Sequence, residues 1–247
     1  MKVSIITVTY NSAATLAETL RSIADQDYKD LELIIVDGGS TDGTLGILED
    51  NQSIVTKFVS EKDNGLYDAI NKGIAMASGE LVGILHSDDF YIHSKVISNY
   101  VACFQSTQAD AVYADLFYVD RNDTNRIIRK WKSGTYSNRS FYRGWMPPHP
   151  TFFVKRSLYE QFGKFDLQFK TAADYELMLR FILKEKIKIA YLPEFTVKMR
   201  MGGASNASIS NRINANLEDR EAWRKNNLQP AFYTLYLKPL RKLLQFF

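Results

Sequence analysis

Short apolar runs alternate with segments of helical spacing through about the first hundred residues, and this alternation constrains the fold more than any other feature. The apolar runs are strand-sized: Val3–Thr9, Leu31–Val36, Ile54–Ser60 and Leu81–Leu85. The segments between them are expected to be helical over 16–23, 44–49 and 66–77. Strands and helices that alternate in this way form βαβ units around a parallel sheet. We therefore expect an α/β domain that binds its ligand at the carboxyl ends of the strands.

The pattern is less regular in the second half of the chain. Ala111–Val119 and Arg126–Trp131 are expected to pair as antiparallel strands, because the residues between them favour a turn. Residues 133–150 are expected to form a long loop. Further elements are expected over 151–154 (strand), 172–185 (helix), 187–192 (strand) and 206–226 (helix). We therefore expect one α/β domain over residues 1–205 and a C-terminal helical extension over 206–247.

The composition excludes several classes of protein. The 31 Lys and Arg residues against 28 Asp and Glu give a net charge of +3, which is too small for a nucleic-acid surface. The single cysteine, Cys103, excludes a disulfide within the chain, and three histidines leave little room for a zinc cluster. The apolar runs are far shorter than the roughly 20 residues of a membrane-spanning helix. The N-terminus lacks the apolar core of a signal peptide, so we expect a cytoplasmic protein.

An acidic pair, Asp88-Asp89, follows the fourth apolar run. Adjacent carboxylates repel each other unless a cation or solvent intervenes. Mg²⁺ and Mn²⁺ prefer oxygen ligands and often bridge one or two carboxylates to substrate phosphates. The alternative is a solvated turn that caps a helix beginning at Phe90, and the dipeptide alone favours this second interpretation.

A second acid, Asp37, ends the second apolar run and precedes a glycine-rich turn. An acid at a strand end can accept hydrogen bonds from a ribose or from a base N–H. The spacing of the glycines matches neither a P-loop nor a dinucleotide-binding fingerprint. The alternative is a tight turn in which Asp42 caps the next helix.

The third motif runs from Lys62 to Gly73 and includes Asp68 and Asn71, which stand three residues apart on one helix face. These two side chains can hold a ribose or support a metal ligand, or they can serve only as helix caps.

Asp174 lies in the first turn of the helix expected over 172–185. Thr171 and Asp174 have the spacing of a capping box. In the functional alternative, Asp174 is a general base that takes a proton from an acceptor hydroxyl.

Five short segments, taken in order, resemble the family 2 glycosyltransferases of GT-A fold. The segments are Val3–Asn11, Asp37–Thr44, Gly65–Gly73, Ser78–Glu80 and Ser87–Asp89. The ordered set is much more specific than any one segment. The resemblance covers about residues 1–205 and is strongest over residues 3–90. It implies a Rossmann-like, mostly parallel sheet flanked by helices.

The resemblance also implies a nucleotide-sugar site. Tyr10 would stack on the nucleobase, and Asp37 would hydrogen-bond to it. Asp88 would lie near the ribose. Thr9 and Asp68 complete the expected nucleotide-binding set.

The same resemblance implies the catalytic groups. Asp89 would bind Mn²⁺ or Mg²⁺, which bridges the diphosphate and offsets the charge on the leaving group. Asp174 matches the position of the family's catalytic base. The family often has Glu-Asp there, where this chain has Ala173-Asp174.

The implied reaction is inverting transfer of a hexosyl or N-acetylhexosaminyl group from a nucleotide-diphosphate sugar, foremost a UDP-sugar. The acceptor would be a hydroxyl of a glycan or a lipid-linked sugar in bacterial surface-polysaccharide assembly. A single displacement inverts the anomeric centre and needs one carboxylate base. The alternatives are a nucleotidyltransferase-like enzyme, although no basic triphosphate-binding loop is found, and a non-catalytic sugar-binding module on the same fold.

Two further residues carry weaker expectations. His149, in a Pro-rich segment, can meet the metal, the phosphate or the acceptor, or lie in a surface loop. Arg200, with the loop 202–205, can close over the diphosphate as mobile loops do in such enzymes, or merely connect to the C-terminal helices.

The C-terminal tail, Pro230–Phe247, mixes aromatic, leucine and basic residues, and Pro239 is expected to break or kink a helix there. Residues 224–247 hold five Lys and Arg and no acid, so the rest of the chain has a net charge of −2. An interfacial helix would place the protein on the cytoplasmic face of the inner membrane. The alternative is a terminal helix that docks on the protein or in a homodimer.

Overall fold

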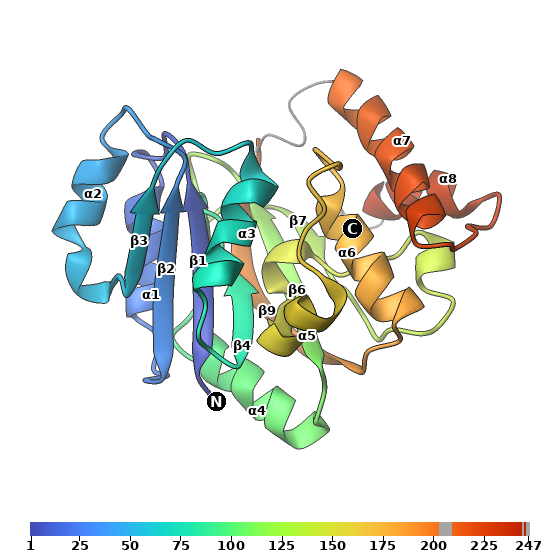
Figure 1. Cartoon of the computed structure of the whole chain (residues 1–247), viewed down its shortest axis with the longest axis horizontal. Helices are drawn as coiled ribbons and strands as arrows, with labels where there is room; N and C mark the ends of the chain where they lie inside the picture. Colours follow the sequence, from blue (N-terminus) through green and yellow to red (C-terminus); the bar gives the residue numbers. More distant parts are fainter. Residues whose placement is uncertain (203–208, 244, 246–247) are drawn as a thin grey trace.

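The computed structural model describes residues 1–202, 209–243 and 245. Its centre is one mixed sheet in the order β3-β2-β1-β4-β8-β6-β9-β5, with β7 paired to β6 (Figure 1). The strands are β1 (Val3–Thr9), β2 (Leu31–Asp37), β3 (Lys57–Ser60), β4 (Leu81–Ile84), β5 (Asp89–Tyr91), β6 (Ala111–Val119), β7 (Ile127–Trp131), β8 (Phe153–Lys155) and β9 (Ile189–Arg200). The first four strands are parallel, and so are β6 and β9, whereas the other pairs are antiparallel.

Helices cover both faces of the sheet and bury one core on each side (Figure 1). The helices are α1 (Leu16–Ala24), α2 (Thr44–Asp50), α3 (Leu66–Met76), α4 (Val96–Thr107), α5 (Arg156–Phe162), α6 (Ala173–Met178), α7 (Ile209–Lys225) and α8 (Thr234–Leu243). Helices α3, α5 and α6 pack on one face, and α1 and α4 pack on the other. Gly73 lets α3 approach β1, because a side chain there would collide with Ile6. The expected α/β architecture is confirmed.

Three local expectations are wrong. The third strand begins at Lys57 instead of Ile54, because Gln52–Ile54 forms a 3₁₀ turn. The segment after the acidic pair is strand β5, and the next helix starts only at Val96. Phe90 and Tyr91 suit a strand, and β9 supplies a partner from about one hundred residues later. Strand β9 runs on to Arg200, well beyond the expected end at residue 192.

The loop that leads into α1 links several strand ends. Neither Asn11 nor Ser12 caps this helix; its N-cap is Thr15, which makes no side-chain capping bond. Asn11 instead adopts a left-handed φ of 48° and accepts a hydrogen bond from Thr41 N at 2.9 Å. The Ser12 hydroxyl lies 2.8 Å from that of Ser87. These side chains therefore join the loops that follow β1, β2 and β4.

The two C-terminal helices pack against the second half of the sheet domain (Figure 1). Trp223 of α7 is fully buried and donates a hydrogen bond to the Tyr175 hydroxyl at 2.9 Å. Helix α8 continues through Pro239, so the expected break is not seen. The boundary expected at residue 205 lies outside the described residues. Within the described part of the chain, every helix is too short or too polar to cross a bilayer.

Candidate active site

The carboxyl ends of the parallel strands meet at one edge of the sheet, and Asp37 organises this edge. Thr9 pairs with Asp37, and Asp37 pairs with Ser60. The buried Asp37 carboxylate accepts hydrogen bonds from Gly39 N at 3.0 Å, Ser40 N at 2.9 Å, the Ser40 hydroxyl at 2.5 Å and the Ser60 hydroxyl at 2.6 Å. Asp37 therefore fixes the glycine-rich turn in which sequence analysis expected a base contact.

Tyr10 and Asp63 flank the backbone of that turn at Gly38. A Cβ atom on Gly38 would lie 2.6 Å from Asp63 Oδ2 and 3.4 Å from Tyr10 Cδ2. The Tyr10 ring is 63% exposed, so it is available to stack on a base. Asp63 was missed by the sequence analysis. Its place beside the Asn64-Gly65 turn, where its Oδ1 accepts a hydrogen bond from Gly65 N at 2.8 Å, is the signal that could have found it.

Thr9 and Asp68, which are also expected at the nucleotide, lie in different settings. Thr9 is 4% exposed, and its hydroxyl has no hydrogen-bond partner among the described residues. Asp68 accepts a hydrogen bond from Asn64 N at 3.0 Å and lies 3.7 Å from Lys72 Nζ. Asp68 thus steadies the turn that carries Asp63.

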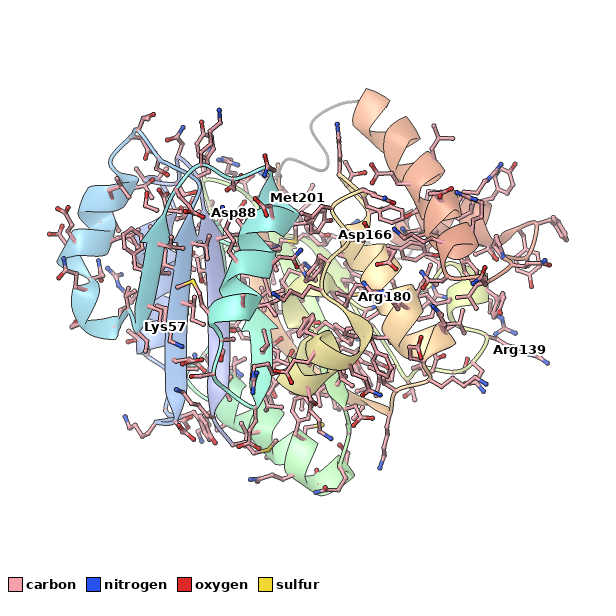
Figure 2. All side chains as sticks on the ribbon, in the orientation of Figure 1. Lys57, Asp88, Arg139, Asp166, Arg180 and Met201 are labelled. Carbon is pink, nitrogen blue, oxygen red and sulfur yellow. The ribbon has the colours of Figure 1, made fainter. Side chains whose placement is uncertain are left out.

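The two acids of the Asp88-Asp89 pair have different surroundings. Asp88 is half-buried at the edge of the sheet (Figure 2). Asp89 is 1% exposed; its Oδ1 accepts a hydrogen bond from Arg200 N at 3.3 Å, and its Oδ2 has no partner among the described residues. Burial, reinforced by the charge of Asp88, raises the pKa of Asp89 well above its usual value. A cation bound next to Asp89 Oδ2 would stabilise the charged forms of both carboxylates.

These two acids fit a hard cation that takes its remaining ligands from a substrate. The described residues hold no group of three or more His, Cys, Asp or Glu side chains placed to bind a metal. Mg²⁺ and Mn²⁺ do not need such a group, because phosphate oxygens and waters complete their coordination. The oxygen donors of Asp88 and Asp89 suit these ions by type.

Arg200 fastens the end of β9 to the acidic pair. It is 5% exposed and donates to the Asp88 carbonyl at 2.6 Å while forming an ion pair with Glu18. Its guanidinium also lies 5.0 Å from the centre of the Phe90 ring. Gly202 is described, but the rest of the loop that sequence analysis expected to close over a diphosphate lies outside the described residues.

Asp174 stands in the first turn of α6, and its two carboxylate oxygens differ. Oδ1 accepts hydrogen bonds from the Tyr67 hydroxyl at 3.3 Å and from Tyr175 N at 2.8 Å. Oδ2 accepts none from the residues that the structure describes. One oxygen is therefore held in place by two hydrogen bonds, and the other makes none to the described residues.

The capping box expected between Thr171 and Asp174 does not form. Glu218 of α7 takes that role, with hydrogen bonds from Lys170 N at 3.1 Å, Thr171 N at 2.8 Å, the Thr171 hydroxyl at 2.9 Å and Ala172 N at 2.9 Å. A carboxylate from the C-terminal extension thus satisfies the start of the helix that carries Asp174.

Two histidines lie beside these acids. The rings of His86 and His149 are 5.7 Å apart. Burial lowers the pKa of His149 to about 3, with His86 adding to the effect. Burial also lowers the pKa of His86, although the charges of Asp88 and Asp174 oppose the shift. His149 is therefore a half-buried neutral imidazole and does not lie in a surface loop. His86 was missed by sequence analysis, although it shares the strand end of Asp88.

Asn71 fixes the main chain of Phe165. Its amide donates to the Phe165 carbonyl at 2.8 Å and accepts from Phe165 N at 3.0 Å. The Phe165 ring stacks on Tyr67 with centroids 5.5 Å apart and meets His149 edge-on at 5.6 Å. Sequence analysis expected Asn71 at a ribose or a metal ligand. In the structure, Asn71 instead positions Phe165, whose ring packs on Tyr67, and Tyr67 donates a hydrogen bond to Asp174.

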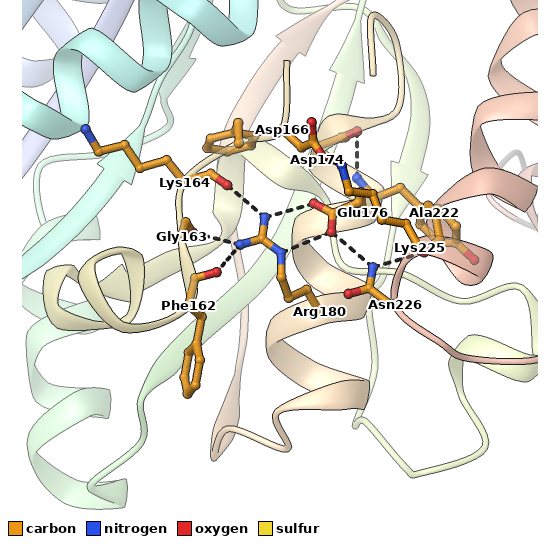
Figure 3. Close-up of polar contacts among 12 residues, drawn as sticks. Phe162, Gly163, Lys164, Asp166, Asp174, Glu176, Arg180, Ala222, Lys225 and Asn226 are labelled. Atoms are coloured by element: carbon orange, nitrogen blue, oxygen red, sulfur yellow. Dashed lines mark hydrogen bonds and ion pairs between the residues drawn. The ribbon is translucent and has the colours of Figure 1, made fainter. Parts of the chain in front are cut away.

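The half-buried Arg180 side chain ties the loop before Phe165 to α6, next to Asn226, which follows α7 (Figure 3). Arg180 binds both oxygens of Glu176, at 3.0 and 2.8 Å. It also donates to the main-chain carbonyls of Phe162, Gly163 and Lys164. Asn226 completes the cluster with a 3.0 Å hydrogen bond to Glu176. The loop before Phe165 is therefore held by contacts from distant parts of the chain.

Solved structures with the same fold confirm the expected GT-A architecture. S. aureus TarS 1-349 in complex with UDP-GlcNAc gives a TM-score of 0.71 at 22% identity, over 92% of this chain and 65% of that chain. The mannosyltransferase PcManGT from Pyrobaculum calidifontis, in complex with GDP-Man and Mn²⁺, gives 0.67 at 21% identity, over 96% of this chain and 68% of that chain. At these identities the likeness shows the fold.

Sequence relatives add the family. An uncharacterised glycosyltransferase of Mycobacterium tuberculosis is 33% identical over 180 residues, which make up 72% of this chain and 68% of the relative. A PGL/p-HBAD biosynthesis glycosyltransferase of Mycobacterium bovis is 30% identical over 212 residues, 83% of this chain and 80% of the relative. The family model described as Glycosyl transferase family 2 matches residues 4–163. The chain therefore belongs to glycosyl transferase family 2.

Proposed function

We propose that the protein is an inverting glycosyltransferase that moves a sugar from a nucleotide-diphosphate sugar to a hydroxyl of a glycan or a lipid-linked acceptor. The observation that carries this proposal is that Asp174 and the Asp88-Asp89 pair lie near the same side chain, His86. His86 lies close enough to both Asp88 and Asp174 for their charges to act on its pKa. The bound UDP-GlcNAc and GDP-Man of the two structural neighbours support a donor of this class.

The nucleotide would occupy the edge formed by the loops after β1 to β4. Tyr10 offers an exposed ring for the base, and Asp63 offers a carboxylate beside it for a base N–H. Asp37 acts indirectly, since it fixes the turn that brings Gly38 between them. A UDP-sugar is the first donor to test.

A divalent Mn²⁺ or Mg²⁺ would be held by Asp88 and Asp89. When bound, this cation offsets the negative charge that develops on the leaving diphosphate. Asp88 presents the more accessible carboxylate, and Asp89 presents an unpartnered oxygen. The Mn²⁺ in one structural neighbour supports this assignment.

Asp174 would act as the base. The acceptor oxygen attacks the anomeric carbon, the bond from that carbon to the diphosphate oxygen breaks, and the hydroxyl proton passes to Asp174 Oδ2. The hydrogen bonds on Oδ1 orient the carboxylate for this transfer. One displacement with no covalent enzyme intermediate inverts the anomeric centre.

The test is a screen of nucleotide sugars with and without Mn²⁺, repeated with Asp174→Asn. We expect the variant to keep donor affinity and to lose about 10²–10⁴-fold in transfer rate, as a lost general base does. Asp50→Asn, an exposed carboxylate on α2, is the matched control. Wild-type turnover in Asp174→Asn would overturn the role of the base.

Pyrophosphate release from a nucleoside triphosphate and a sugar phosphate would instead indicate a nucleotidyltransferase. Donor binding without transfer would indicate a non-catalytic binding module.

A further inference from the structure

Helix α8 is held firmly against the body of the protein along one side. Lys238 forms an ion pair with Asp219 at 2.6 Å, and its ammonium lies 3.5 Å from the centre of the Tyr175 ring. Gly144, with a left-handed φ of 73°, meets the backbone of Lys238 so closely that any side chain there would collide with it. The orientation of the helix is therefore fixed.

The opposite side of this segment is aromatic and exposed. Phe232 is 89% exposed, Tyr236 69%, Leu240 54% and Tyr233 39%. Tyr236 and Leu240 stand four residues apart on α8 and so share one side of it. Phe232 and Tyr233 lie in the turn just before the helix, with their ring centroids 5.1 Å apart. Single exposed apolar residues are ordinary on a protein surface, whereas a contiguous group usually marks an interaction site. We call these four residues the aromatic face.

Two cations lie where α8 packs on the short helix Phe141–Arg143, and one of them, Arg241, directly follows Leu240 of the aromatic face. Partial burial and the charge of Arg143 both lower the pKa of Arg241, so these two guanidiniums are neighbours. Neither has an acidic partner in the part of the chain that the structure describes. Arg139 extends into solvent just before Phe141–Arg143, the short helix on which α8 packs (Figure 2). Neighbouring cations repel each other unless an anion lies between them.

We infer that the aromatic face, with Arg143 and Arg241 beside it, docks on the surface of an anionic lipid bilayer. Aromatic side chains with a polar tip favour the boundary between headgroups and acyl chains. Cations near that boundary gain about 1 kcal/mol each from anionic lipids. Three of the five Lys and Arg residues of 224–247 pair with nearby acids, so the charge that is complementary to such a surface comes from Arg143 and Arg241. The inference does not depend on the proposed catalytic activity.

The experiment is co-sedimentation of the 247-residue chain with vesicles of phosphatidylcholine alone or of phosphatidylcholine with phosphatidylglycerol. We expect binding to the anionic vesicles that weakens as salt is raised. The double variant Phe232→Ser/Tyr236→Ser should bind them at least about tenfold more weakly. Phe58→Ser is the matched control, since Phe58 is 49% exposed on β3, in the other half of the sheet, and its loss should change nothing.

A second variant tests the cations separately. Arg143→Gln/Arg241→Gln should weaken binding to the anionic vesicles about thirtyfold, the effect of two cations at about 1 kcal/mol each. Binding to neutral vesicles should stay as it is. All these substitutions are of exposed side chains, so thermal unfolding should match that of the parent chain.

Three results would overturn the inference. The first is a parent chain that does not bind the anionic vesicles. The second is equal binding by the parent chain and the two double variants. The third is light scattering that shows a dimer of the parent chain and a monomer of Phe232→Ser/Tyr236→Ser, because the aromatic face would then be covered by a second copy.

Discussion

The two sides of the candidate site are built in different ways. On the nucleotide side, Asp37 takes its partners from Gly39, Ser40 and Ser60, all within 23 residues. On the acceptor side, Tyr67 reaches Asp174 across 107 residues, and Asn71 reaches Phe165 across 94. The first side is a set of local turns, and the second side is an assembly of distant segments.

In the proposed reaction, this difference separates the binding of the donor from the transfer of the sugar. The local turns are complete once β1 to β4 have paired, so the nucleotide side depends little on the C-terminal extension. The setting of Asp174 depends on α3, on the Phe165 loop, on Glu218 of α7 and on Asn226, which directly follows that helix. Substitutions on the acceptor side should therefore change transfer while leaving donor binding intact.

The largest effect is expected where the two sides meet, at the acidic pair. Asp88→Asn and Asp89→Asn should each weaken Mn²⁺-dependent binding of a UDP-sugar by at least roughly 100-fold, because each removes a charge that attracts the cation. Calorimetry with and without Mn²⁺ measures this, with Asp50→Asn as the control. Unchanged affinity in both variants would remove the metal from the acidic pair. A loss in Asp88→Asn alone would make Asp89 a support for its neighbour.

Arg180→Met should cost about 3–5 kcal/mol of unfolding free energy, because Glu176 is 2% exposed and would keep an unpaired charge. Urea unfolding measures the loss. Arg224→Met is the matched control, because it breaks an exposed ion pair with Glu221 at i,i+3 spacing. That control should cost no more than about 0.5 kcal/mol. Equal costs in the two variants would mean that the buried pair does not hold the acceptor side together.

Glu218→Gln tests the link between the C-terminal extension and Asp174. It removes the charge that caps α6, and we expect a loss of about 1 kcal/mol in stability. Transfer should slow several-fold while donor affinity stays the same. Glu221→Gln removes an exposed partner of Arg224 from the same helix and should be silent. Weaker donor binding in Glu218→Gln would mean that the two sides are coupled more tightly than their contacts indicate.

The same contrast explains what the sequence could predict. β1 was predicted to the residue and β2 to within one, because a continuous apolar run followed by turn residues carries its own boundaries. β5 was missed because Phe90 and Tyr91 become a strand only when β9 pairs with them. Asp37 was found at the correct strand end, but its engagement with Ser60 depends on the neighbouring strand. His86 and Asp63 were missed because their neighbours in the site, His149 and Gly38 respectively, lie far from them in the sequence.

Tyr67→Phe should have the smallest effect and the most specific one. The Tyr67 hydroxyl donates to Asp174 Oδ1 and so helps to orient the carboxylate, while the ring stacking on Phe165 survives the substitution. Without this hydrogen bond Oδ1 keeps only the one from Tyr175 N, so transfer should slow about two- to threefold, which corresponds to about 0.5 kcal/mol for a long bond. Donor affinity, measured by calorimetry, should stay that of the parent chain.

The same variant separates positioning from packing. Steady-state kinetics should place the loss in kcat and leave the KM for the donor unchanged. Tyr159→Phe is the matched control, because Tyr159 packs on Phe165 at 6.4 Å and its hydroxyl donates no hydrogen bond to the described residues. Equal transfer rates for Tyr67→Phe and the parent chain would show that Tyr67 contributes only its ring stacking on Phe165. Slower transfer with unchanged donor affinity would show that a residue of α3 positions the proposed base on α6.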